Sequence, residues 1–293
     1  MSFRRLMICL LALGLLWGWG VSEQASFAAQ SVATPNAASQ PRAQSQQEFE
    51  AYQAFMEESN PERQIQLVED FLFQFPDTQL KQYAFQVAMQ AYQAKNDYDR
   101  VLTYGELTLG ENRNNLTALL ILASAIPEAT NRNDPEHEEK LADAEDYARR
   151  ALEVLSRMPR PEHLSEEEWA RARRETEATP RAALGLIAMI REDLTLAERE
   201  LRRAVELAAR PDPVTLYRLG LCYSLQKKYD LALEALDRAS QGGGVKITTP
   251  EGLGRDLVAE AREFVLKAKA ALGTSESEPA ARTTMPVEAG PTP

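Results

Sequence analysis

The stretch "LYRLGLCYSLQKKYDLALEALDRA", residues Leu216–Ala239, combines features that seldom meet in one helical pattern. Gly220 lies inside a helix-forming run, although Gly costs about 1 kcal/mol relative to Ala in a helix interior. Tyr223 and Tyr229 follow, and small Ala residues recur after them. Because a residue without a Cβ lets a second helix approach closely, the stretch predicts two short helices packed tightly together.

The same pattern occurs 35 residues earlier, in "AALGLIAMIREDLTLAERELRRAVEL", residues Ala182–Leu207. Leu184-Gly185 aligns there with Leu219-Gly220. Five further pairs have the same offset: Ala188 with Tyr223, Leu194 with Tyr229, Ala197 with Ala232, Leu201 with Leu236, and Ala204 with Ala239. A fixed period of about 34 residues is typical of a stacked array of helical hairpins.

This motif resembles that of the tetratricopeptide repeat (TPR) family. The resemblance implies an all-α fold, an α-solenoid of stacked antiparallel helical hairpins with a C-terminal capping helix. It is clearest over residues 180–241 and weaker over the rest of 47–272, where Met89 replaces the Gly. An insertion is expected at residues 127–179, because the joint between the helices of that unit is longer than the family usually has.

Helix-start signals divide the chain further. Four pairs place an N-capping residue before a Pro that lacks the N–H left unpaired there: Asn60-Pro61, Asp134-Pro135, Asp212-Pro213 and Thr249-Pro250. Ser165 and Glu168 form a capping box. Thr179-Pro180 leaves two alternatives open, a new helix start or a kink within one continuous helix.

No alternating segment suggests a strand. The signals predict twelve helices, at residues 47–58, 61–75, 78–94, 97–110, 114–126, 135–157, 165–178, 180–191, 194–209, 213–226, 229–241 and 250–272. Since most connections are short, neighbouring helices must pack antiparallel. In the helix at 61–75, Phe71 and Phe75 share a face and should be core, whereas Phe73 points elsewhere.

The first residues have the layout of a secretory signal peptide, residues 1–28. Arg4 and Arg5 precede an apolar run, and Ser26-Phe27-Ala28 offers small residues for cleavage after Ala28. An uncleaved membrane anchor is the alternative, although Leu6–Val21 is shorter than the roughly 20 residues that a spanning helix needs. We therefore expect an exported protein of the periplasm or cell envelope, which contacts the membrane only if this segment is uncleaved.

Two further segments read as disordered. Residues 29–46 and 274–293 lack an apolar face, so the folded repeat domain should occupy residues 47–273. The net charge of −11 argues against nucleic acid as a partner, because phosphate binding needs a basic surface.

The sequence offers little for catalysis, and we predict no catalytic residue, no metal site and no cofactor. His137 and His163 are expected to be solvated, and Cys222 to be a small core residue. The run 242–244 reads as a helix stop, since it lacks the Lys-Ser/Thr of a phosphate loop. The run 166–168 reads as a helix start and not as a cation site.

The resemblance to TPR arrays implies a groove, lined by the first helices of successive units, that takes a peptide or a partner helix. The residues flanking the Leu-Gly pairs would line it: Ala182, Leu186, Met189, Tyr217, Leu221 and Ser224. These are mostly apolar, and the Asn and Lys with which some members clamp a C-terminal carboxylate are absent.

The predicted function is therefore a non-enzymatic interaction module, a scaffold or adaptor for a protein or peptide partner in a bacterial envelope. Two alternatives stay open. One is an accessory subunit of an envelope enzyme complex. The other is a carboxylate-dependent enzyme, which would show paired acids converging in a pocket with raised pKa values.

Overall fold

The computed structural model describes residues 42–131, 133–248 and 254–275. This part of the chain holds eleven helices and two short strands, in the order α2 (Gln46–Glu57), α3 (Pro61–Gln74), α4 (Lys81–Ala94), α5 (Tyr98–Glu111), α6 (Leu116–Ala129), α7 (His137–Arg157), α8 (Glu166–Ile190), α9 (Leu194–Leu207), α10 (Pro213–Leu225), α11 (Tyr229–Gln241), β1 (Lys246–Thr248), β2 (Gly254–Asp256) and α12 (Leu257–Ser275).

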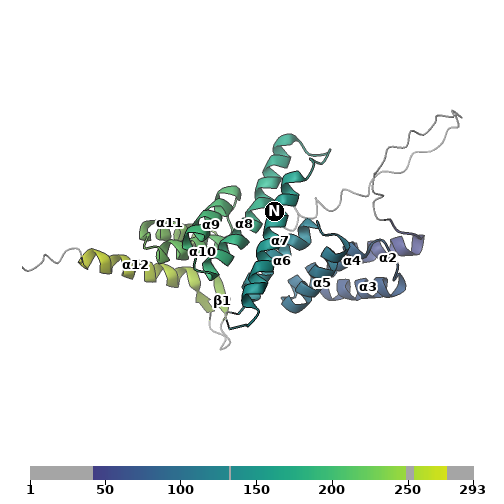
Figure 1. Ribbon diagram of the computed structural model, residues 1–293, viewed down its shortest axis with the longest axis horizontal. Helices are drawn as coiled ribbons and strands as arrows, with labels where there is room; N and C mark the ends of the chain where they lie inside the picture. The colour runs from purple at the N-terminus through teal and green to yellow at the C-terminus, as the bar shows by residue number, and fades with distance from the viewer. Residues whose placement is uncertain (1–41, 132, 249–253, 276–293) are drawn as a thin grey trace, which may run out of the picture. The chain divides into compact units, whose positions relative to one another are not determined.

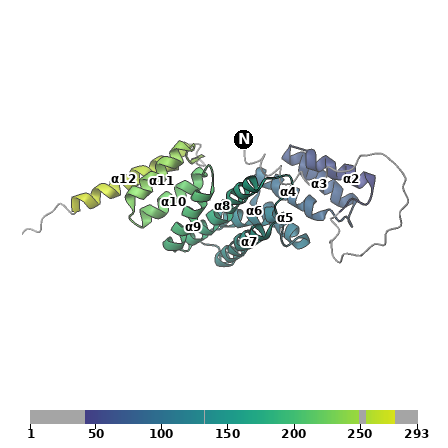
Figure 2. The same ribbon diagram turned by 90° about the horizontal axis from the view of Figure 1, so that it is seen from above.

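The helices form successive antiparallel hairpins, and each packs on the next along the chain (Figure 1). The pairs are α2/α3, α4/α5, α6/α7, α8/α9 and α10/α11, and α12 packs on the last of them (Figure 2). The first helices of neighbouring pairs also contact one another, α6 with α8 and α8 with α10. This arrangement confirms the predicted α-solenoid.

Three of the hairpins share one turn. A left-handed residue lies between the two helices in each case, Asn96, Glu192 and Lys227, with φ of 58°, 63° and 61°. The residue after it donates its backbone N–H to a carbonyl five residues back, as from Lys228 to Tyr223 at 2.9 Å. Because the last two turns are also 35 residues apart, the repeat read from the side chains holds for the backbone as well.

The two glycines of the motif lie where two helices touch. A Cβ built on Gly220 would come within 2.8 Å of Cγ of Leu236, and one on Gly185 within 2.6 Å of Cγ of Leu201. No side chain fits into such a gap. The close helix contact therefore offsets the propensity cost of each glycine, as the sequence predicted.

Helix α8 is continuous, which settles the alternative left open at Pro180. Its start has the predicted capping box, because Ser165 accepts from the Glu168 N–H and the Glu168 carboxylate accepts from the Ser165 N–H. Pro180 lies buried in the middle of the helix. The predicted pair of helices at 165–178 and 180–191 is therefore wrong, since packing on both sides holds the Pro in one helix.

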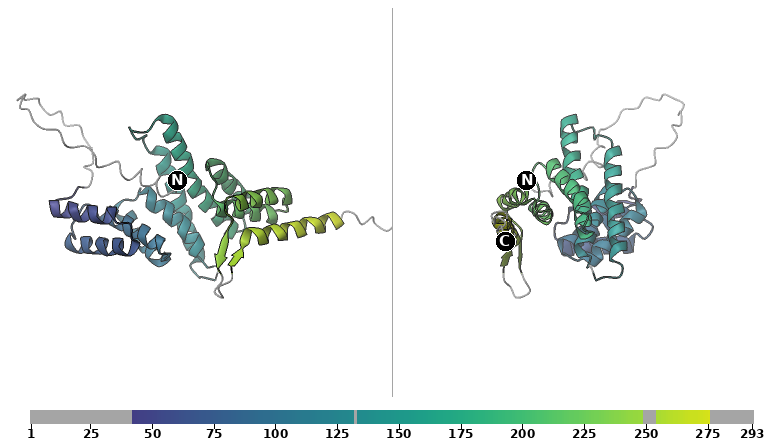
Figure 3. Two further views of the ribbon diagram at one scale, coloured as in Figure 1. Left: turned by 180° about the vertical axis from the view of Figure 1, so that it is seen from behind. Right: turned by 60° about the vertical axis from the view of Figure 1, so that its left-hand side comes forward.

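The C-terminal part differs from the prediction in two ways. An antiparallel hairpin of β1 and β2 precedes α12, although no strand was expected (Figure 3). Helix α12 begins at Leu257 and not at residue 250, because Asp256 accepts from the N–H groups of Val258 and Ala259 and so caps the helix there. Residue 250 itself lies outside the described part.

The glycine run after α11 is a helix stop, as predicted. Gly243 and Gly244 have φ of 116° and 70°, values that favour glycine. The Gly244 N–H donates back to the carbonyl of Ala239 at 2.9 Å. Helix α12 then covers the open side of α11, where it buries Val258 and Val265 and pairs Arg262 with Asp237 at 2.6 Å. Its Phe264 stays exposed, so the cap is not wholly polar.

Several helix starts move inward from the predicted positions. Helix α7 begins at His137, because the Asp134 carboxylate forms a turn with the Glu136 N–H and pairs with Lys140 ahead of the helix. Helix α4 begins at Lys81 after a buried turn, in which Thr78 donates to the Glu48 carboxylate.

The ends of the predicted folded domain shift by a residue or two. Gln46, expected in the linker, is the first residue of α2, and α12 extends to Ser275. The predicted signal peptide, most of the predicted linker and residues 276–293 of the predicted tail lie outside the described residues.

The first hairpins pack around aromatic residues. Phe55 contacts Tyr52 and Phe71 edge-on, with ring centroids 5.2 Å apart in both pairs, and Phe71 contacts Phe75 at 5.3 Å. Phe71 is buried and Phe73 is exposed, as predicted, whereas Phe75, which was also predicted to be core, is half-buried and lies just after the end of α3.

Helix α6 is apolar on almost every side and lies buried among α4, α5, α7 and α8. Next to it, Tyr147 of α7 donates to the Glu106 carboxylate of α5 at 3.1 Å. Burial, reinforced by this carboxylate, raises the pKa of Tyr147 to about 12.

Candidate functional site

The six predicted groove residues lie on two neighbouring first helices. Ala182, Leu186 and Met189 belong to α8, and Tyr217, Leu221 and Ser224 belong to α10. We call the surface formed by these six residues the groove face. Residues three or four apart share one side of a helix, so each set of three forms a stripe along its helix. Because α8 and α10 contact one another, the two stripes belong to neighbouring elements.

The members of the groove face differ in burial. Met189 and Tyr217 pack against the C-terminal core, and Ser224 is buried. Ala182, Leu186 and Leu221 are half-buried. Three of the six residues are therefore partly structural, and the remaining three are the ones most available to a partner.

Two further residues of this surface, Leu225 and Arg218, were not predicted from the sequence. Leu225 follows Leu221 by one turn and is 63% exposed, which extends the apolar stripe of α10. The same spacing could have identified it from the sequence. Arg218, on the same side of α10, pairs with Glu128 at the end of α6 at 3.1 Å. No sequence signal predicted this pair, because the two residues lie 90 positions apart.

Tyr217 is also close to the start of α12. Burial raises its pKa, and the nearby Glu260 carboxylate adds to the shift while Arg255 opposes it. Arg255 and Glu260 form an ion pair of their own across the β2–α12 junction. The hydroxyl end of Tyr217 therefore lies beside a charge pair, whereas its ring packs on the core.

Three residues of reactive types, to which the sequence assigned no catalytic role, can now be located. Cys222 is buried, its thiol faces the Leu194 carbonyl at 3.5 Å, and burial raises its pKa. His163 is exposed, and His137 is half-buried at the start of α7. Within residues 42–131, 133–248 and 254–275, no group of His, Cys, Asp and Glu side chains is arranged to hold a metal ion.

Six carboxyl groups of the described residues have a shifted pKa, and all six are shifted downward: Asp134, Glu145, Glu168, Glu198, Glu260 and Glu263. Hydrogen bonds from Lys, Arg, Gln, Ser or backbone groups stabilise the charged form in each case. These carboxylates stay ionised at neutral pH and are suited to ion pairing.

Among the described helices, none combines the length and the hydrophobicity that a bilayer crossing demands.

Comparison with known proteins gives a likeness in fold only. No protein-family model matches the chain, and no curated protein does. Solved structures of TPR proteins are similar to it. The thermophilic TPR protein TTC0263 of Thermus thermophilus has 15% sequence identity and a TM-score of 0.44, and the match covers 76% of this chain and 99% of that chain.

Two further structures are similar to a comparable degree. YrrB, a TPR protein with an unusual peptide-binding site, has 17% identity and a TM-score of 0.46, over 75% of this chain and 88% of that chain. The assembly chaperone of RpL4 has 12% identity and a TM-score of 0.49, over 79% of this chain and 98% of that chain. The TPR-type fold itself rests on the hairpins, turns and glycine contacts described above.

Proposed function

We propose that this TPR-type helical array is a protein-interaction module, a scaffold or adaptor that binds an apolar peptide or a partner helix along the groove face. The observation that carries the proposal is the apolar stripe of Leu186, Leu221 and Leu225, two half-buried residues and one exposed residue on contacting helices. Apolar side chains at a helix spacing are what an amphipathic partner helix needs in order to bury its own apolar side.

The charges beside the stripe favour an apolar partner over a peptide that is held by its C-terminal carboxylate. Arg218 pairs with Glu128, which leaves no net positive charge on this pair to attract a C-terminal carboxylate. The other residues of the groove face carry no charge. Affinity would therefore come mainly from burial of apolar surface, at about 25 cal/mol per Å² removed from water.

We further propose that the protein acts in a bacterial envelope, on the strength of the signal-peptide layout of residues 1–28.

The test is retention of partner proteins from an extract of the protein's own cells. We expect the double variant Leu186→Glu, Leu221→Glu to lose a partner that the wild-type chain retains, because each Glu would place an uncompensated charge against the partner's apolar side. The loss should be at least about tenfold in affinity, or ~1.4 kcal/mol.

The matched control is Phe73→Glu, Leu107→Glu, which replaces two exposed apolar residues far from the groove face in sequence. It adds the same charge and should retain the partner at the wild-type level. Circular dichroism must show the same helicity for all three chains. Equal retention by the two double variants would overturn the assignment to the groove face.

A further inference from the structure

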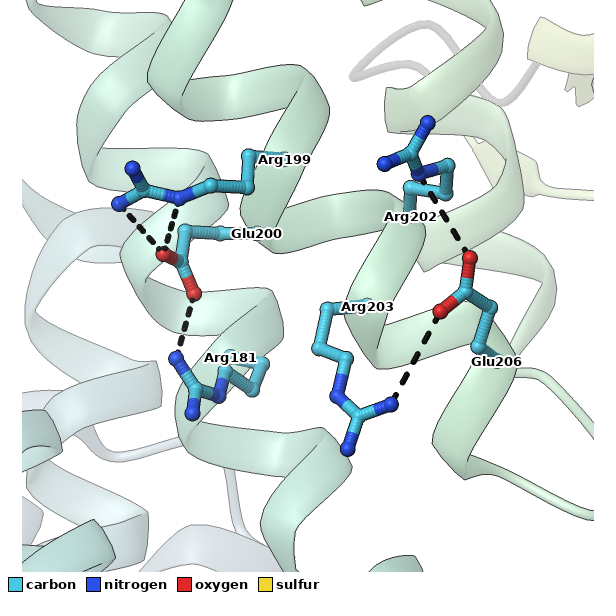
Figure 4. A pocket seen from close by; sticks show the side chains of 6 residues that line it. All are labelled: Arg181, Arg199, Glu200, Arg202, Arg203 and Glu206. Atoms are coloured by element: carbon cyan, nitrogen blue, oxygen red, sulfur yellow. Dashed lines mark hydrogen bonds and ion pairs between the residues drawn. The ribbon is translucent and has the colours of Figure 1, made fainter.

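A cavity of about 270 Å³ lies between α8 and α9 and is lined almost entirely by charged side chains (Figure 4). One residue comes from α8, and the other five come from α9: Arg181, then Arg199, Glu200, Arg202, Arg203 and Glu206. Four guanidinium groups face the two carboxylates of the lining and the adjacent Glu177, which pairs with Arg181, so the local excess is one positive charge. The chain as a whole has a net charge of −11, so this local excess has the opposite sign.

Two of the four arginines are held firmly. The side chain of Glu200 is only 6% exposed, and its two oxygens accept from Arg181 at 3.0 Å and from Arg199 at 2.9 Å. Arg181 also donates to Glu177 at 3.1 Å. A buried carboxylate with this many donors fixes the inner wall of the cavity.

The other two arginines are held loosely. Arg202 and Arg203 share the single carboxylate of Glu206, at 3.6 and 3.9 Å, distances longer than a hydrogen bond. All three side chains are about half exposed. In Figure 4 the two guanidinium groups lie on either side of Glu206. They therefore keep donors for a further acceptor, because a guanidinium has five N–H groups.

The cavity is distinct from the groove face. Successive helix residues are about 100° apart around the axis, so Arg181 and its neighbour Ala182 point in different directions from α8. Gly185, which faces Leu201 of α9, separates the two sides. Leu186 lies on the same side as Ala182, and Arg181 lies on the other.

We propose that this cavity is a second binding site, which takes a carboxylate from an acidic segment of a protein partner. Arg202 and Arg203 share the single carboxylate of Glu206, so their remaining positive charge matches one further carboxylate, and planar guanidinium groups suit carboxylate oxygens. The cavity already shows this pairing with Glu200 and Glu206. An incoming carboxylate would replace the loose Glu206 contact at Arg202 and Arg203, while Glu200 keeps the inner wall in place.

The test measures binding of a fluorescein-labelled hexaglutamate peptide to the full chain by fluorescence anisotropy. We expect the wild-type chain to bind it, and Arg202→Gln, Arg203→Gln to weaken binding at least about tenfold, or ~1.4 kcal/mol. We expect Glu206→Gln to strengthen binding, because it frees both guanidinium groups. Misfolding cannot produce a gain of binding, so this variant keeps the test independent of stability.

The control variant is Arg149→Gln, Arg157→Gln, which removes two exposed arginines from α7 with the same change in charge. It should bind like the wild type, and a hexaglutamine peptide should bind to none of the chains. Equal loss in both double variants would reduce the binding to general charge attraction and overturn the site. Absence of binding to the wild type, or weaker binding by Glu206→Gln, would overturn it too.

A competition arm separates the carboxylate site from a phosphate site. Glutarate should displace the labelled peptide at a lower concentration than inorganic phosphate does. The reverse order would overturn the assignment to an acidic peptide and show a phosphate site. Hexaglutamate binding does not depend on whether the Leu186→Glu, Leu221→Glu variant loses its partner. The test of the cavity and the test of the groove face can therefore fail separately.

Discussion

The substitution Gly185→Ala should lower the free energy of unfolding by about 1–3 kcal/mol, although Ala is the better helix former. The added Cβ would lie 2.6 Å from Cγ and 3.2 Å from the backbone N of Leu201. Rotation of the Leu201 side chain cannot relieve the second contact, because it involves the main chain. Helices α8 and α9 must therefore move apart, and the packing around them must loosen. Urea denaturation followed by circular dichroism measures the change.

Gly110→Ala supplies the control for this prediction. Gly110 lies in α5, and nothing is within 4 Å of the place where its Cβ would lie. The same chemical change should stabilise the protein there by about 0.5–1 kcal/mol, because only helix propensity is involved. The contrast in sign identifies close packing as the role of Gly185. Stabilisation by both substitutions would contradict it.

The second large effect is expected for Phe71→Ala, which should lower the free energy of unfolding by about 3–5 kcal/mol. Phe71 is 1% exposed and contacts the rings of Phe55 and Phe75. Removing its ring leaves a cavity among the first two hairpins that the neighbouring aromatic rings cannot fill without leaving their own positions. Thermal unfolding of the variant should begin at a lower temperature.

Phe73→Ala tests the same residue type two positions along the same helix. Phe73 is 88% exposed, so its loss should change stability by no more than about 0.5 kcal/mol. Similar losses at both positions would mean that α3 presents a different side to the core than the structure shows. A loss of stability in Phe71→Ala alone establishes that the Phe71 side of α3 faces the core.

The architecture could be predicted because its determinants are local and repeated. Gly185 with Leu201, and Gly220 with Leu236, are the same contact at the same spacing, so either pair reveals the other. Capping by Ser165 is equally local, since donor and acceptor lie within one helical turn. Such features leave a signal in any short window of sequence.

The structure departs from the prediction where tertiary contacts, and not local sequence, determine the local structure. Pro180 stays within α8 because packing overrides its usual helix-breaking effect. The strands β1 and β2 are three residues each, too short for a periodic pattern to show. Gly105 of α5 lies against Leu122 of α6, with 2.6 Å from its Cβ position to Cδ2, at a place outside the repeat motif.

For the six residues of the groove face, the sequence indicated the two helices that carry them but not how deeply each residue is buried. The resemblance implied the six residues of the groove face by number, and they do lie on contacting helices. The core contacts of Met189 and Tyr217 were not readable from spacing, because their partners lie on other helices. The arginine cavity was missed for the same reason. Arg181 and Glu200 are 19 residues apart and meet only when α8 and α9 close on each other.

The most direct test of the account is photocrosslinking from single positions in the protein's own cells. A photoreactive phenylalanine analogue would replace Leu221 in one chain and Leu107, an exposed residue of α5, in another. We predict a discrete crosslinked product from position 221 and none from position 107. The same product from both positions, or a product from position 107 alone, would contradict binding along the groove face.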